Sequence, residues 1–249
     1  MDRDRRVRWV AGSAVALALL FAGVATVASA RDDGPDHAAD HAAAAAPRTP
    51  AVDSADAGFA RDMAVHHQQA VEMSFIVRDR TRDEDVRRLA YDIANTQANQ
   101  RGMLLGWLDL WELPKAAAGQ EPMGWMTAAG HEGHTMEGME GMEGTDGMAG
   151  MEDGTGTGYR AHDGSLMPGM ATRTELNRLR GMSGQQAEIL YLQLMTDHHK
   201  GGVDMARGCA RLCTVKVEKR LAQGMVEAQR SELDMMARML AARGAKPRS

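Results

Sequence analysis

Residues 59–108 and 191–240 are two copies of one sequence, aligned without a gap at an offset of 132 positions. Each copy contains an adjacent pair of histidines, and such a long ungapped match around a His-His pair is not expected by chance. The chain therefore contains a duplicated structural unit. The identical pairs include Met63/Met195, His66/His198, His67/His199, Val71/Val203, Met73/Met205, Leu89/Leu221, Gln97/Gln229, Met103/Met235 and Leu108/Leu240.

Each copy has the pattern of a helical hairpin. In the first copy we expect one helix over residues 56–80. Thr81 and Glu84 have the spacing of a capping box that opens a second helix, and Pro114 ends it. Apolar residues recur at helical spacing between them. The first copy therefore predicts two antiparallel helices.

The second copy repeats this pattern. Ser183 and Gln186 offer a capping box for a helix that runs to Leu212, and a further helix covers residues 215–243. Four amphipathic helices without a strand pattern predict an all-α, antiparallel four-helix bundle. The expected segments are 1–30 (signal), 31–55 (flexible lead-in), 56–113 (first hairpin), 114–172 (disordered Met- and Gly-rich insert) and 173–245 (second hairpin).

One face of each hairpin's first helix carries both histidines and two methionines, which we expect to point into the bundle. On the partner helices Gln100 and Glu232 lie in the apolar stripe, with a methionine one turn further on. The candidate metal ligands of the bundle are Met63, His66, His67, Met73, Met103, Met195, His198, His199, Met205, Glu232 and Met235.

Two interpretations of this layer stay open. Imidazole and thioether together suit copper, with Cu(I) favoured by the methionines and Cu(II) also possible. Alternatively, the histidines are core residues hydrogen-bonded across the bundle to Gln100 and Glu232. In that case the layer sets the packing of a structural or interaction protein.

Cys209 and Cys213 lie one helical turn apart on the same face, and only the second copy has them. A disulfide between positions i and i+4 of a helix is geometrically strained. We therefore weigh two free-thiol interpretations, small buried apolar residues or a thiolate pair that binds a soft cation beside Met205.

The segment between the hairpins repeats methionine at three-residue spacing in a Gly- and Glu-rich background. Flexible thioethers at this spacing can converge on one ion, and a spacer without function is the alternative. We name this candidate region the capture arm. Its predicted ligands are His131, His134, Met136, Met139, Met142, Met148 and Met151.

The N-terminus has four arginines, an apolar run over residues 9–27 and the small residues Ala28-Ser29-Ala30. This pattern is typical of a secretory signal cleaved after Ala30, and an uncleaved membrane anchor is the alternative. We therefore expect an exported protein that is extracellular, periplasmic or attached to the cell envelope. A net charge of -5 gives no reason to expect nucleic acid as a partner.

The motifs Met63-x-x-His66-His67-x-x-Ala70-x-x-Met73 and Met195-x-x-His198-His199-x-Gly201-Gly202-x-x-Met205 resemble a known family. It is the exported, ferritin-like family known as domain of unknown function 305. Met167-Pro168-Gly169-Met170 is similar to that family's lead into the second motif. The resemblance implies copper binding in the cell envelope, because some members bind copper there. Gln100 departs from the acidic residue that the family often has at this position.

From these observations we expect an exported protein that binds, buffers or delivers copper and contributes to copper tolerance. Its partners would be the metal ion and another envelope copper carrier or transporter. Membrane contact is expected only through an uncleaved N-terminal segment. The Glu-x-x-His pairs of di-iron proteins are missing, which excludes ferroxidase chemistry. Since no nucleophile with a base is evident, we expect no enzyme activity; a copper redox enzyme is the less favoured alternative.

Overall fold

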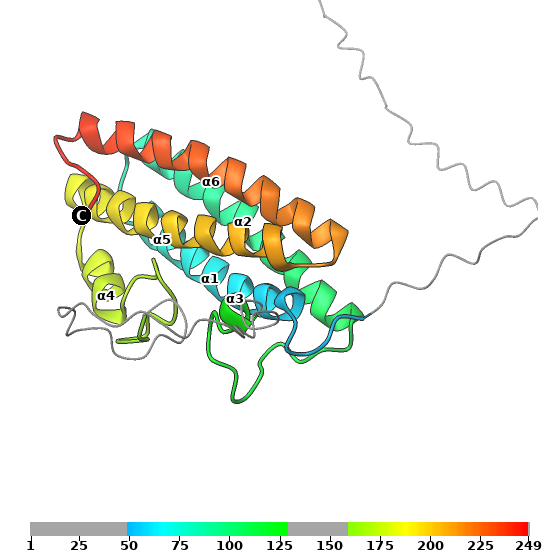
Figure 1. Cartoon of the computed structure of the whole chain (residues 1–249). Coiled ribbons are helices and arrows are strands. Elements are labelled where there is room, and N and C mark those ends of the chain that lie inside the picture. The colour runs from blue at the N-terminus through cyan, green and yellow to red at the C-terminus, as the bar shows by residue number, and fades with distance from the viewer. Residues whose placement is uncertain (1–48, 129–158, 249) are drawn as a thin grey trace, which may run out of the picture. The chain divides into compact units, whose positions relative to one another are not determined.

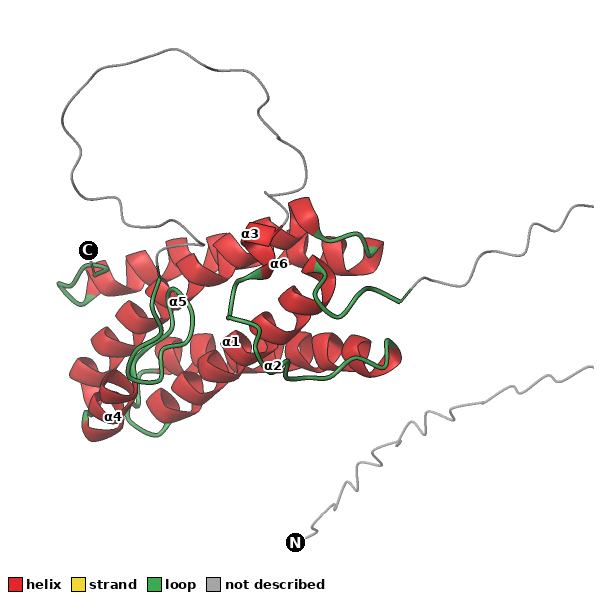
Figure 2. Cartoon of the chain, turned by 60° about the horizontal axis from the view of Figure 1, so that its bottom comes forward, coloured by secondary structure: helices red, strands yellow, loops and turns green. Residues whose placement is uncertain are grey.

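The structure is a computed structural model that describes residues 49–128 and 159–248. These described residues form α-helices joined by turns and loops, and they contain no β-strand, so the fold is all-α (Figures 1 and 2). None of these helices is long and apolar enough to cross a membrane. The helices are α1 (Ala55–Arg78), α2 (Glu84–Leu110), α3 (Trp125–Ala128), α4 (Arg173–Gly181), α5 (Gly184–Leu212) and α6 (Lys216–Ala242).

The four long helices form two hairpins, as the duplication predicts. α1 packs against α2, α5 packs against α6, and the hairpins meet along α1 and α5 (Figure 1). The predicted all-α four-helix bundle is therefore confirmed, and its central contact joins the two helices that carry the His-His pairs.

The helix caps differ from the predicted ones. α2 begins after Asp83, whose carboxylate accepts a hydrogen bond from the Val86 backbone N–H, so the predicted Thr81-to-Glu84 capping box is wrong. Thr81 instead accepts from the Asp83 N–H and donates to the buried Glu188 carboxylate. An aspartate closer to the helix start satisfies the free N–H groups directly, which releases the threonine for a contact between the hairpins.

α5 follows Ser183, but this side chain makes no capping hydrogen bond. The complete capping box lies at α4, where Thr172 and Glu175 exchange hydrogen bonds with each other's backbone N–H. Its Thr-x-x-Glu pattern is visible in the sequence, so the helix could have been predicted from it.

The ends of the predicted insert 114–172 are ordered, which corrects the expectation for residues 114–128 and 159–172. Trp125 of α3 packs edge-on against Phe59, with ring centroids 5.8 Å apart. The Trp125 indole N–H and the Met123 backbone N–H both donate to Asp62. An aromatic ring and two hydrogen bonds thus offset the low helix propensity of this segment. Residues 129–158 lie outside the described part of the chain.

Two hydrophobic clusters fill the bundle, and the His pairs lie between them along α1 and α5. One cluster contains Met63 and Met205 together with Phe59 and Trp125. The other contains Met73 and Met195, and all four methionines are completely buried. Since α1 and α5 are antiparallel, each cluster takes one methionine from each copy of the repeat.

The loop before α4 lies directly on the backbone of α5. A β-carbon added at Gly201 would stand 2.1 Å from the Pro168 carbonyl oxygen, and one at Gly202 would stand 2.5 Å from the Gln229 Oε1. Gly169 has a φ of +83°, a conformation that favours glycine. Gly201 and Gly169 therefore permit a close backbone contact beside His198 and His199 that an added β-carbon would disturb.

We expect Gly201→Ala to lower the free energy of unfolding by about 1–3 kcal/mol, because the added methyl overlaps the Pro168 carbonyl. Gly224→Ala in α6 is the matched control, since nothing lies within 4 Å of its added β-carbon. It should instead raise the stability by about 0.5–1 kcal/mol. Urea unfolding of both variants measures this, and equal effects would contradict the close contact.

Candidate metal centre

The structure brings all four predicted histidines together at the contact of α1 with α5. His66, His67 and His199 are completely buried and His198 is 1% exposed. The rings of His66 and His198 lie 3.7 Å apart between centroids, and those of His198 and His199 lie 6.3 Å apart. His66 and His198 are equivalent positions of the two copies, so the duplicated halves meet at this pair. We call these four residues the His layer.

Two of the four histidines make well-formed hydrogen bonds through a ring nitrogen. The His198 Nε2 lies 2.9 Å from the His66 backbone oxygen and can donate to it. The His199 Nε2 lies 2.6 Å from the Glu232 Oε2. These contacts are those of satisfied core residues, and they support the structural interpretation for the second copy.

Five other buried imidazole nitrogens make no well-formed hydrogen bond within the described ranges. They are both ring nitrogens of His66, both of His67, and the Nδ1 of His199. An unpaired buried polar group costs about 1–3 kcal/mol, so such a concentration calls for a partner. Imidazole nitrogen is a good ligand for copper and zinc, so these residues fit a bound metal.

Burial controls the charge of the layer. It lowers the pKa of His66 and His198 well below the ordinary value, and the neighbouring histidines lower it further. For His67 burial lowers the pKa to about 3, opposed by the Gln100 side chain. These three imidazoles are therefore neutral at pH 7, the form in which they can bind a metal.

No three His, Cys, Asp or Glu side chains of the His layer come close enough to share one ion, as far as the described residues go. An ion in this layer therefore needs further ligands. The completely buried thioethers of Met63, Met73, Met195 and Met205 lie in the clusters on either side of the layer.

The placement predicted for Met103 and Met235 is wrong, because they are 46% and 40% exposed. The buried stripe of α2 runs through Gln97 and Leu104. Met103 lies six positions after Gln97, which is about 120° around the helix, and Met235 has the same relation to Gln229. Both methionines therefore face away from the layer.

Gln97 and Gln229 are the polar residues that sequence reasoning missed. They are 3% and 4% exposed, and neither carbonyl oxygen makes a hydrogen bond to a described residue. They are an identical pair of the repeat in phase with the apolar stripe, which is the signal that could have revealed them. Glu232 lies nearer the edge, with 22% of its side chain exposed.

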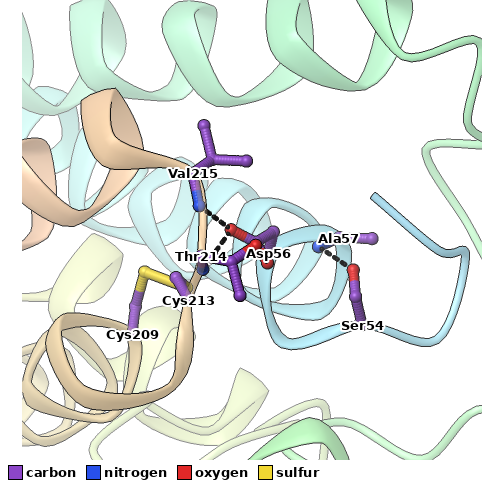
Figure 3. Close-up of a disulfide and its surroundings, with 7 residues drawn as sticks. All are labelled: Ser54, Asp56, Ala57, Cys209, Cys213, Thr214 and Val215. Carbon is purple, nitrogen blue, oxygen red and sulfur yellow. Dashed lines mark hydrogen bonds between the residues drawn. A yellow bond between two sulfur atoms is a disulfide. The ribbon is translucent and has the colours of Figure 1, made fainter. Parts of the chain in front are cut away.

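Cys209 and Cys213 form a disulfide, so the expectation of two free thiols is wrong (Figure 3). α5 ends at Leu212, and Cys213 follows in an extended conformation with φ -62° and ψ 147°. The geometry of a continuous helix therefore does not apply, and the two Cα atoms are only 4.8 Å apart. Sequence reasoning judged the bond strained because it treated the two cysteines as one turn apart on a continuous helix, although the predicted helix already ended at Leu212.

The predicted ligands of the capture arm are His131, His134, Met136, Met139, Met142, Met148 and Met151. All of them lie outside the described residues. The arm therefore stays a prediction.

The family described as domain of unknown function (DUF305) matches residues 56–240, which is most of the chain. The chain belongs to the DUF305 family. The match covers both His-His motifs and the loop between them, which confirms the resemblance seen in the sequence.

Several solved structures are similar to this chain, and two of them are of DUF305 proteins. A predicted secreted DUF305 protein from Streptomyces coelicolor is 56% identical, with a TM-score of 0.63, over 80% of this chain and 99% of that one. A DUF305 fragment from Deinococcus radiodurans is 23% identical, with a TM-score of 0.53, over 76% and 96%. CopM in its Cu(II)-bound form is 17% identical, with a TM-score of 0.47, over 75% and 95%. No protein of curated function matches the chain.

The lowered pKa of His67 makes the stability of the metal-free protein depend on pH. Unfolded His67 binds a proton below about pH 6.5 and folded His67 only below about pH 3, so stability is lost as the pH falls below 6.5. Between pH 7 and pH 5 this residue alone should remove about 2 kcal/mol.

Urea unfolding of the wild type and of His67→Gln at both pH values measures this loss. The variant should lose about 2 kcal/mol less than the wild type, since glutamine does not titrate. His162→Gln is the control, because this histidine is exposed and outside the layer. Equal pH dependence of the wild type and His67→Gln would contradict the buried neutral state.

Proposed function

We propose that this DUF305 protein is an exported copper-binding protein that holds Cu(I) at the His layer and buffers or delivers it in the cell envelope. The observation that carries the proposal is the group of buried imidazole nitrogens without a well-formed hydrogen bond, on His66, His67 and His199. They lie between two clusters that each bury two methionines from different copies of the repeat.

The ligand chemistry favours Cu(I) over harder cations. Neutral imidazole and thioether are the donors that the interior supplies, and such donors select soft metal ions. Mg²⁺ and Ca²⁺ need several oxygen ligands, whereas the layer is bordered by one carboxylate, Glu232. A monovalent ion also requires less compensating charge than a divalent ion in an interior of neutral ligands.

Glu232 and Gln100 make the two copies chemically different. His199 is bonded to a carboxylate, whereas the neighbour of His67 is a neutral amide. A carboxylate on the second imidazole nitrogen orients a ligating histidine and makes it more basic. The second copy would therefore hold its ion more firmly, and the first copy would exchange it more readily.

Three features support export. The N-terminal 30 residues have the pattern of a secretory signal. The 56% identical relative from Streptomyces coelicolor is a predicted secreted protein. A disulfide is also typical of proteins in oxidising compartments. In the envelope the protein would receive copper and hand it to a carrier or transporter, with no catalytic step of its own.

The structural alternative rests on the hydrogen bonds of His198 and His199. These two residues are already paired with the His66 backbone and with Glu232. In that function the layer would fix how α1 and α5 pack, and the protein would bind a partner protein. The two functions differ in what the thioether sulfur atoms do, because packing needs only their volume.

Replacing Met63 and Met205 by leucine tests this difference. Leucine keeps the buried volume, so the metal-free double variant should lose less than about 1.5 kcal/mol of stability. It removes two sulfur ligands, so the affinity for Cu(I) should fall at least about tenfold. Anaerobic titration of the disulfide form against a chromogenic Cu(I) chelator measures the affinity.

Met103→Leu is the matched control for this titration, since it removes an exposed thioether and should leave the affinity unchanged. Unchanged Cu(I) affinity in the Met63→Leu/Met205→Leu variant would overturn the copper site. If the wild type also failed to compete for Cu(I), the structural function would be favoured.

The capture arm makes a separate prediction. Deletion of residues 131–151 should reduce the number of Cu(I) ions bound, because it removes the predicted His and Met ligands of the arm. It should not change the helical content, since the six helices lie outside the deletion. Stoichiometry by titration and far-UV circular dichroism give the two results, and unchanged stoichiometry would refute the arm.

A further inference from the structure

A second group of potential metal ligands lies at the end of the bundle where α5 ends and α1 and α6 begin. The ligand atoms of Cys209, Cys213 and Glu218 all lie within 4.8 Å of one another. Glu218 is completely buried, and the two cysteines are 0% and 2% exposed. Among the described residues this is a compact cluster of two sulfurs and a carboxyl group, and the copper proposal does not use it.

The Glu218 carboxyl group is not explained by its packing. Neither of its oxygens makes a well-formed hydrogen bond to a described residue. Burial, followed by the charge of the neighbouring Asp56 carboxyl and a hydrogen bond to it, raises the pKa of Glu218 to about 9. Glu218 is thus a buried acid that shares its surroundings with a second carboxyl group and lies beside two sulfur atoms, and burying a carboxyl group is costly.

The surrounding backbone is fixed independently of the disulfide. The Asp56 carboxylate accepts hydrogen bonds from the backbone N–H groups of Thr214 and Val215, at 2.8 and 2.7 Å (Figure 3). These residues directly follow Cys213 and lead into α6. Since the disulfide closes only a four-residue separation, it adds little constraint of its own. The end of the bundle should therefore keep its shape when the disulfide is reduced.

We propose that reduction of the Cys209–Cys213 disulfide opens a buried site for a borderline divalent cation such as Zn²⁺, with Cys209, Cys213 and Glu218 as its protein ligands. An external dithiol supplies two electrons and two protons; the S–S bond breaks, two protein thiols form, and the dithiol becomes a cyclic disulfide. Binding then releases the two thiol protons and the Glu218 proton. The fourth ligand of the tetrahedron is a water molecule.

Charge selects the class of cation. Two thiolates and a carboxylate carry three negative charges, so a divalent ion leaves less uncompensated charge in the interior than Cu(I) does. Thiolate and carboxylate are also a normal ligand set for zinc. The first copy of the repeat has Val77 and Thr81 where the second has the cysteines, so this site belongs to the second copy alone.

The test compares the disulfide form with the dithiol-reduced form of the protein, freed of dithiol by anaerobic gel filtration. Zn²⁺ is titrated into each form in competition with a chromogenic chelator. Any Zn²⁺ binding at the His layer is common to both forms, so it cancels in the difference between the two titrations. We expect about one further tight Zn²⁺ equivalent in the reduced form. Co²⁺ in its place should give a sulfur-to-cobalt charge-transfer band in the reduced form only.

Variants assign the ligands. Cys209→Ser/Cys213→Ser should lose the further equivalent, and Glu218→Gln should weaken it at least about tenfold. Glu227→Gln, an exposed position of the same helix, should leave it unchanged. Far-UV circular dichroism checks that each variant is folded, and the Co²⁺ band identifies sulfur ligands where a variant is less stable.

No further equivalent in the reduced protein would overturn the proposal, as would a further equivalent that survives Glu218→Gln at full affinity. The two proposals share no ligand, so they fail separately. Loss of Cu(I) binding in the disulfide form would affect only the His layer, and a missing Zn²⁺ equivalent would affect only this site.

Discussion

The burial of four imidazole rings at the contact of α1 with α5 is the constraint on which the rest of the fold depends. Removal from water lowers the pKa of His66, His67 and His198 and keeps these three rings neutral, because a charged imidazole in this interior would be far costlier than a neutral one. Neutral rings still need partners, and the described residues supply them for only part of the layer. The methionine clusters, the glycines of α5 and the loop of Pro168 all serve to close this layer from water.

The duplication creates a nearly symmetric layer, and a few residues then make its halves different. His66 meets its own counterpart His198, as expected where two copies pack across a local twofold relation. The second copy alone has the carboxylate of Glu232, the close contact of Gly201 with the loop, and the disulfide. Divergence after duplication has therefore concentrated charge, backbone contacts and redox chemistry in one hairpin.

The repeat and the helical period were enough to predict the bundle and the inward direction of all four histidines. The number of helices and the direction of their buried faces are properties of whole helices, and an apolar pattern with a period of 3.6 residues predicts them reliably. The errors arose from details of a few residues. For Met103 an error of about 120° in the direction of the buried stripe placed an exposed residue in the core.

Near Thr81 the helix began two residues later than expected, and at Cys213 the chain leaves the helix in the extended conformation that brings the two cysteines together. Helix ends depend on competing caps, such as Asp83 against Thr81, and this competition is decided by contacts from other parts of the chain. The same holds for α3, whose four residues are helical because Trp125 packs against Phe59. The buried Glu218 was also beyond the reach of sequence reasoning, since its environment comes from three different helices.

The two candidate sites show how a protein interior can separate metals by charge. The His layer offers neutral nitrogen and sulfur, which suits an ion whose single charge needs little compensation. The cluster at the end of α5 offers three groups that become anionic on binding, which suits a divalent ion. Because the sulfur atoms of that cluster are joined in the disulfide, only the His layer is available in an oxidising compartment. The redox state of two cysteines would thus decide which of the two sites the protein presents, without any change in the bundle that holds them.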